Sequence, residues 1–300
     1  MKLSVTVPVY NETRNIAPFY ERIKPVLESI DGVREWEIVF VNNGSEDRTL
    51  QEILDFRKRD ARVKVVTLSR NFGYQSALIA GLSYGVADLF AAIDVDCEDP
   101  PELLIKFYDA IRSGAQIAYG IRSDRDEPAI ITICRKAFYY LNKMVADSEI
   151  IVWMSEFCMM TRQVKEAILA AKTTYPFLRA EICYVGFTRV GIAYRRAARL
   201  HGGSHYNLFG MIRFAIGGVL SSSTFPLRLV LYLSVFLALA YPIGVIIFGI
   251  STDQAVKLAV ILAFYFLLIS IPALALYLAR TYKNGVARPI FVVDEAQTFL

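Results

Sequence analysis

Short apolar runs alternate with helix-like segments along the first 120 positions of the chain. The apolar runs are typical of buried strands and occupy residues 3–9, 37–41, 63–68, 89–94 and 115–120. The segments between them have the pattern of helices, near residues 15–30, 47–59, 73–85 and 101–112. Regular alternation of this kind is typical of a parallel sheet covered by helices on both faces. The pattern therefore predicts an α/β fold with a mostly parallel sheet.

Two long uncharged stretches follow, at residues 229–250 and 258–279. Each is long enough to cross a bilayer, which takes about 20 apolar residues in a helix. Because only residues 251–257 separate them, we expect a hairpin of two transmembrane helices. Basic residues flank the far ends of the hairpin, at Arg213, Arg228, Arg280, Lys283 and Arg288. The positive-inside rule then predicts a multi-pass protein of the cell (inner) membrane, with most of the chain on the cytoplasmic face.

Residues 207–222 are apolar as well but contain Arg213, and too few residues separate it from Arg228 to span a membrane. We expect an interfacial helix here, although a core helix of the first domain would show the same pattern. The predicted organisation is a cytosolic domain (1–206), an interfacial helix (207–226), two transmembrane helices (227–281) and a cytosolic tail (282–300).

Composition agrees with a membrane protein. The chain is 55% hydrophobic and 21% charged, and its mean hydropathy is +0.38. The net charge of +4 comes without a long basic run, so we expect no nucleic-acid partner. The four cysteines have neither Cys-x-x-Cys nor zinc-like spacing.

Polar residues follow the predicted strands, where ligands bind in open parallel sheets. They are residues 10–12, 42–45, 69–71 and 94–99. The last group is the most acidic, since Asp94, Asp96, Glu98, Asp99 and Glu102 fall within nine positions. Such repulsion calls for a counter-charge, and Mg²⁺ or Mn²⁺ held by one or two carboxylates and substrate phosphates would supply it. Asp99 and Glu102 also suit the start of a helix.

Several motifs in this order resemble those of the polyprenyl-phosphate glycosyltransferases, which are inverting family-two enzymes with a Rossmann-type GT-A fold, related to dolichol-phosphate mannose synthase and bactoprenol glucosyltransferase. The motifs are VPVYNE (7–12), VNNGSEDRT (41–49), LSRNFGYQSALIAGL (68–82), DVDCEDPPE (94–102), YGIR (119–122) and RRAARLHGGSHY (195–206). The resemblance implies transfer of a sugar from a nucleoside-diphosphate sugar to membrane polyprenyl phosphate. A UDP-sugar, as in UDP-glucose, is the favoured donor.

The resemblance also implies roles for individual residues. The catalytic residues would be Asp94, Asp96 and Glu156. The nucleotide sugar would contact Pro8, Tyr10, Glu12, Asn43 and Asp94. The acceptor phosphate would contact Arg122, Arg195, Arg199 and Ser204, and the metal Asp96 and Glu98. We expect a homo-oligomer.

This chain departs from the family pattern at three places. Asn42-Asn43 replaces a pair that is normally acidic, and Glu98 stands where the family usually has Gln. Ser155-Glu156-Phe157-Cys158 replaces an Asp-Phe-Arg-Leu-like motif, so Glu156 either orients the reacting groups or pairs with Arg179. A GDP-mannose-dependent mannosyltransferase and a catalytically silent nucleotide-sugar binder in a membrane complex are therefore the alternatives.

Overall fold

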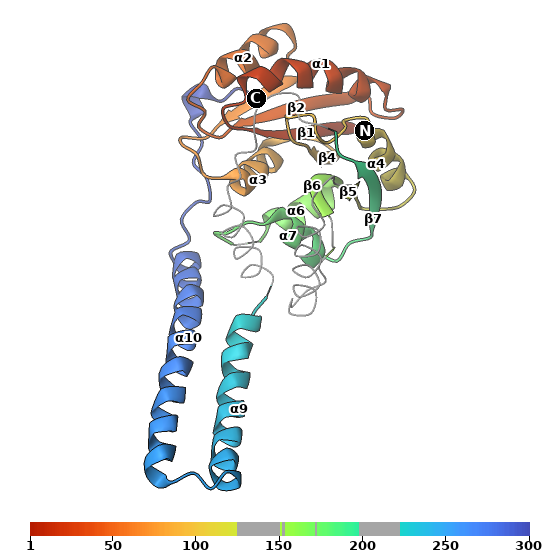
Figure 1. Ribbon diagram of the computed structural model, residues 1–300. Coiled ribbons are helices and arrows are strands. Elements are labelled where there is room, and N and C mark those ends of the chain that lie inside the picture. The colour runs from red at the N-terminus through yellow and green to blue at the C-terminus, as the bar shows by residue number, and fades with distance from the viewer. Residues whose placement is uncertain (125–150, 152–153, 172, 198–222) are drawn as a thin grey trace.

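The computed structural model describes residues 1–124, 151, 154–171, 173–197 and 223–300 (Figure 1). Seven strands form one sheet in the order β3-β2-β1-β4-β6-β5-β7. Their bounds are β1 Lys2–Val9, β2 Glu35–Asn42, β3 Val63–Thr67, β4 Leu89–Ala92, β5 Ile117–Asp124, β6 Met154–Thr161 and β7 Arg189–Arg195. β6 runs antiparallel to β4 and β5, and the other pairings are parallel. The predicted α/β fold with a mostly parallel sheet is confirmed, whereas β6 and β7 were not among the five predicted strands.

Helices cover both faces of the sheet (Figure 1). They are α1 Thr13–Ser29, α2 Thr49–Arg59, α3 Tyr74–Tyr84, α4 Leu103–Arg112, α6 Arg162–Leu169 and α7 Leu178–Tyr184. Successive strand residues face opposite sides: Ile38 and Phe40 pack in the core layer under α1, α2 and α4, and Val39 and Val41 pack under α3. Because both faces are covered, the strands are apolar at nearly every position, as the sequence pattern predicted.

The last residues of the chain pair with the edge of the sheet. After the last helix, α10 (Thr252–Val286), residues 290–300 return to β3. There the Val65 and Phe299 backbones exchange hydrogen bonds of 2.9 and 2.8 Å, and the Ser69 N–H donates to the Val292 carbonyl. A short 3₁₀ helix, η1 (Glu295–Gln297), lies within this segment. Phe291 packs against the core under α3. The segment satisfies backbone groups that an edge strand would otherwise expose.

Two further helices, α9 (Phe225–Ile247) and α10 (Thr252–Val286), lie side by side below the sheet domain (Figure 1). Both are long and apolar enough to cross a membrane, and almost none of their surface is buried by the rest of the protein. Tyr241 of α9 donates its hydroxyl to the Ala255 carbonyl of α10, and Tyr277 of α10 donates to the carbonyl of Ser223, two residues before α9. These helices indicate membrane association. Each helix begins before its uncharged stretch, and α10 also continues past residue 281, where the second transmembrane helix was predicted to end. The predicted interfacial helix falls mostly outside the described residues, and Phe225 and Pro226 belong to α9.

Candidate active site

Two carboxylates lie at the carboxyl end of β4 and on the strand beside it. Ala92, the last residue of β4, pairs with Cys158 of β6. Asp94 follows two residues after Ala92, and Glu156 stands two residues before Cys158 on β6. The insertion of an antiparallel strand beside β4 therefore brings residues 62 positions apart in the sequence to one place.

Asp94 lies in an environment that disfavours its charge. The Tyr74 hydroxyl, at the start of α3, donates to Asp94 Oδ1 at 2.6 Å. Burial and the nearby Asp99 carboxylate raise the pKa of Asp94 to about 7, while the Tyr74 hydrogen bond opposes this and Asp96 adds to it. Negative charge thus exceeds positive charge around Asp94, even though Arg122 is near.

This pKa predicts that the metal-free protein becomes less stable as the pH rises from about 4 to about 7. In that range the unfolded chain has released the Asp94 proton, at an ordinary pKa of 3.8, whereas the folded protein still holds it. At about 1.4 kcal/mol per pH unit, the penalty at pH 7 reaches at most about 4 kcal/mol. We expect Asp94→Asn to melt at a higher temperature than the unsubstituted protein at pH 7.5 in EDTA.

The comparison requires thermal midpoints in detergent between pH 4.5 and 8. The advantage of Asp94→Asn should grow with pH and level off above about pH 7. Asp88→Asn is the matched control, because Asp88 stands just before β4, at its other end, and its side chain is 51% exposed. A difference that does not depend on pH would contradict the raised pKa of Asp94.

The acid loop, residues 94–99, is held by its own side chains and by β7. Asp96 is 5% exposed, and its Oδ1 accepts the Glu98 N–H at 3.1 Å. Glu98 forms an ion pair with Arg196 at 2.5 Å. Cys97 between them has a φ of 58°, a left-handed conformation that turns the loop. Glu98, predicted to share a metal with Asp96, is therefore already paired with a cation.

Asp99 is the most buried carboxylate of the loop and has three partners. It is 1% exposed. Arg122 Nη2 donates to Asp99 Oδ2 at 3.1 Å, the Tyr194 hydroxyl donates to Oδ1, and Arg196 Nε lies 3.5 Å from Oδ1. Burial and Asp99 raise the pKa of Tyr194 to about 12, so the phenol keeps its proton. This network fixes the acid loop against β5 and β7.

The donor set suits a divalent cation only together with a ligand. Within the parts of the chain that the structure describes, no three His, Cys, Asp or Glu side chains are arranged to hold a metal ion. Mg²⁺ commonly takes only one or two protein carboxylates and completes its shell with substrate phosphates and water. Asp94, in surroundings with excess negative charge, and Asp96, two residues further along, fit that requirement.

The predicted acceptor-phosphate residues are only partly described. Arg122 is 18% exposed and is committed to Asp99 and to the Tyr194 hydroxyl, at 3.2 Å. Arg195 is exposed. Alternation along β7 turns Tyr194 and Arg196 toward Asp99 and Arg195 to the other side. Arg199 and Ser204 lie outside the described residues. Arg196, the residue after β7, is half-buried in ion pairs with the acid loop.

The predicted nucleotide residues gather at the carboxyl ends of β1 and β2. Pro8 is buried within β1, and Tyr10 is 37% exposed just beyond it. Glu12 accepts a hydrogen bond from Asn15. The Asn43 amide holds the following loop, because its Oδ1 accepts the Phe72 N–H at 2.9 Å and its Nδ2 donates to Asn71. Asn43 therefore shapes this edge of the site through the backbone of residues 71–72.

Glu156 forms the ion pair that the sequence offered as its alternative role. Arg179 Nε donates to Glu156 Oε1 at 3.0 Å, and Gln75 Nε2 donates to the same oxygen at 2.9 Å. Tyr74, Gln75 and Tyr194 also belong to the site, although none of them was predicted from the sequence. Tyr74 and Gln75 could have been found, since they follow the polar loop after β3 inside a motif that carries the resemblance.

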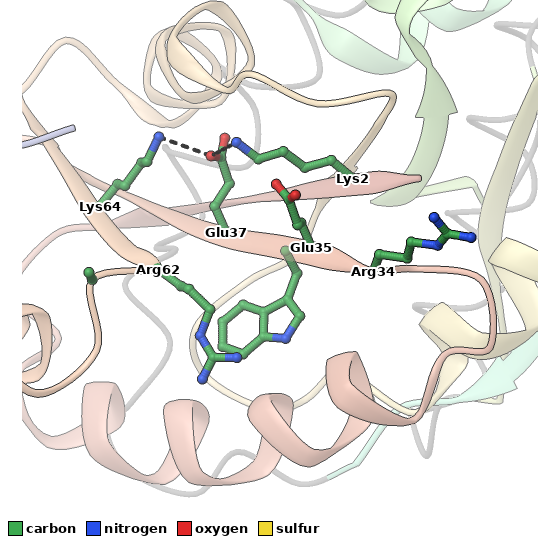
Figure 2. A pocket seen from close by; sticks show the side chains of 8 residues that line it. Lys2, Arg34, Glu35, Glu37, Arg62 and Lys64 are labelled. Carbon is green, nitrogen blue, oxygen red and sulfur yellow. Dashed lines mark ion pairs between the residues drawn. The ribbon is translucent and has the colours of Figure 1, made fainter.

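A pocket of about 280 Å³ lies at the other end of the sheet, beside the amino ends of β1 to β3 (Figure 2). Lys2 and Lys64 both reach Glu37 there, at 2.8 and 2.9 Å. The Arg62 guanidinium stacks 3.8 Å from the centre of the Trp36 ring. Lys2 and Lys64 thus neutralise the Glu37 carboxylate. The pocket is remote from the acid loop, which lies at the carboxyl ends of the strands.

The family model and two relatives that this chain matches are all named as glycosyltransferases. The model of "Glycosyl transferase family 2" matches residues 4–165. The chain is 32% identical to a bactoprenol glucosyl transferase of Shigella phage SfV, over 98% of each chain. It is 30% identical to the glycosyltransferase YkcC of Bacillus subtilis, over 99% of this chain and 94% of that one. Glucosyl-3-phosphoglycerate synthase from Mycobacterium tuberculosis, solved with Mn²⁺, UDP and phosphoglyceric acid, has a similar fold, with a TM-score of 0.51 and 18% identity over 73% of this chain and 78% of that chain.

Proposed function

The chain belongs to glycosyl transferase family 2, and on that premise we propose that it transfers a sugar, with inversion, from a nucleoside-diphosphate sugar to polyprenyl phosphate in the membrane. The observation that carries the proposal is the 32% identity to a bactoprenol glucosyl transferase over almost the whole chain. The match includes α9 and α10 as well as the sheet domain. A donor site above a pair of membrane-type helices suits a water-soluble donor and a lipid acceptor.

The acid loop is the proposed donor site. Asp94 and Asp96 would hold Mg²⁺ or Mn²⁺ together with the diphosphate. The cation supplies neutralisation of the charge that builds up on the departing diphosphate. Tyr10, Glu12 and Asn43, with Pro8 beneath them, would bind the nucleoside at the neighbouring strand ends. A UDP-sugar such as UDP-glucose is the proposed donor.

Arginine side chains are the proposed acceptor site. A lipid phosphate with a second pKa near 6 is largely ionised at neutral pH, so it attacks the sugar without a strong base. Its binding requires cationic forks, because guanidinium groups bond phosphate oxygens in pairs. Arg122, Arg195, Arg199 and Ser204 would provide these contacts, with the sheet domain on the cytoplasmic face of the membrane.

A turnover assay tests the proposal. The full chain in detergent, with Mn²⁺ and a polyprenyl phosphate, is given UDP-glucose, GDP-mannose or other nucleotide sugars. We expect nucleotide release from one donor only when the lipid is present, and a polyprenyl-phosphate sugar detectable by mass spectrometry. The matching polyprenol without its phosphate is the control. Nucleotide release at the same rate with and without polyprenyl phosphate, or no release from any donor, would reject this function.

A further inference from the structure

The Glu156 carboxylate is held by one oxygen only. Oε1 accepts two hydrogen bonds, from Gln75 and from Arg179, as described above. Oε2 is buried, in a side chain that is only 12% exposed, and it has no hydrogen-bond partner within the described residues. Buried acceptors are nearly always satisfied in folded proteins, so an open one in a candidate site indicates that a ligand completes it.

The chemistry of this oxygen restricts the ligand. A carboxylate paired with a guanidinium offers only acceptor positions. It therefore binds a hydroxyl or an amide N–H and repels a phosphate. Of the parts of a nucleotide sugar, the diphosphate is excluded, and the transferred sugar is rich in such donor groups.

The position of Glu156 points to the sugar end of the donor. Glu156 lies on β6, the strand beside β4, and Tyr74 donates to Asp94 just after β4. Burial raises the pKa of Tyr74, and the charges of Asp94 and then Glu156 raise it further, which requires both carboxylates to lie near its hydroxyl. With the diphosphate near Asp94, the next group along the donor reaches Glu156.

Gln75 and Arg179 fix the direction of this carboxylate by linking three elements. Gln75, on α3, donates to Glu156 and accepts the N–H of Leu178, the first residue of α7, at 2.9 Å. Arg179, on α7, also donates to the Met154 carbonyl at 3.2 Å, at the start of β6. Its guanidinium stacks on the Phe177 ring at 4.9 Å. Glu156 is therefore clamped from two helices through one oxygen.

We propose that Gln75 and Arg179 are positioning residues that hold Glu156 so that its open oxygen accepts a hydroxyl or amide N–H of the transferred sugar. The inference rests on the proposed function for the identity of the donor. It makes sugar selection depend on Gln75, to which the resemblance gave no role.

Binding measurements with two Gln75 variants test the inference. Gln75→Glu keeps an acceptor for the Leu178 N–H but loses the donor to Glu156, and Gln75→Leu loses both without adding charge. Calorimetry with Mn²⁺ compares UDP-glucose with UDP, and GDP-mannose with GDP. We expect the preference for the sugar-bearing nucleotide to fall about tenfold in both variants, the value of one hydrogen bond of about 1.4 kcal/mol, with nucleotide affinity changed less than twofold in Gln75→Leu.

Deoxy analogues of the bound donor separate positioning from general damage. The analogue that lacks the recognised hydroxyl should bind the unsubstituted protein about tenfold more weakly and lose nothing further in Gln75→Leu. Gln116→Leu is the matched control, since Gln116 makes a similar side-chain bond to Gln163 on the surface. Its sugar preference should be unchanged.

An unchanged sugar preference in both Gln75 variants would overturn the inference. This includes the case in which the affinities for nucleotide and nucleotide sugar fall by the same factor. Failure of the proposed function is distinguishable, because it concerns the lipid. If the protein binds the sugar in a Gln75-dependent way but transfers it to no polyprenyl phosphate, the role of Gln75 is supported and the proposed lipid acceptor is rejected.

Discussion

Asp96→Asn is expected to lower sugar transfer about a thousandfold while leaving the fold intact. The carboxylate is 5% exposed at the centre of the acid loop and would contact the metal and the diphosphate under the proposed function. Removing one preorganised electrostatic contact to developing charge costs about 10²–10³ in rate, and weaker metal binding adds to that loss. Asn retains an oxygen that can accept the Glu98 N–H. The loop should therefore keep its conformation.

The measurement is the rate of polyprenyl-phosphate-dependent nucleotide release over a range of Mn²⁺ concentrations, with the thermal midpoint measured in parallel. Asp88→Asn is the control: it makes the same chemical change just before β4, where Asp88 accepts the Lys2 N–H and pairs with Arg162. Its transfer rate should stay within about twofold. An Asp96→Asn protein with full activity would remove Asp96 from the metal site, and one that fails to fold would make its role structural.

Arg122→Met is expected to destabilise the protein by about 3 kcal/mol and to weaken its use of the lipid phosphate. Asp99 is 1% exposed, and Arg122 is its closest cationic partner. Breaking a buried ion pair from one side costs about 3–5 kcal/mol, because a charge is left buried. Tyr194 and Arg196 still contact Asp99, which favours the lower end of that range.

A double variant separates the two roles of Arg122. Arg122→Met with Asp99→Asn removes both charges, so stability should largely return. The KM for polyprenyl phosphate should stay raised if Arg122 also contacts the acceptor. Arg162→Met is the control, since its partner Asp88 is 51% exposed, and such surface pairs contribute about 1 kcal/mol or less. Recovery of both stability and KM in the double variant would reduce Arg122 to a support for the acid loop.

The first five strands were predictable because each is a short apolar run buried on both faces. Val5, Ile38, Val65 and Ala91 belong to one core, and their neighbours pack on the opposite face. β7 was not predicted, because this strand begins and ends with an arginine, Arg189 and Arg195, and is largely exposed at the sheet edge. The pairing of the C-terminal residues with β3 was not predicted either. It joins residues 65 and 299 and depends on a free strand edge, which the local sequence pattern does not reveal.

The acids after β4 were predictable for the same reason as the strands. A carboxylate cluster at the carboxyl end of a buried strand can be seen in the sequence, and so can the two long apolar helices. The partner of each acid depends on the topology. Glu98 pairs with Arg196 because β7 lies parallel to β5, and Glu156 comes to the strand beside β4 because β6 enters the sheet antiparallel between β4 and β5.

The first five strands, the acidic loop and the membrane-type hairpin were predictable from the sequence, because hydrophobic periodicity and local charge act over a few neighbouring residues. Which oxygen of Glu156 stays open, and which charges neutralise each other, could be seen only in the folded chain. Those outcomes depend on strand order and register, which bring together residues such as Gln75, Glu156 and Arg179 that are far apart along the chain.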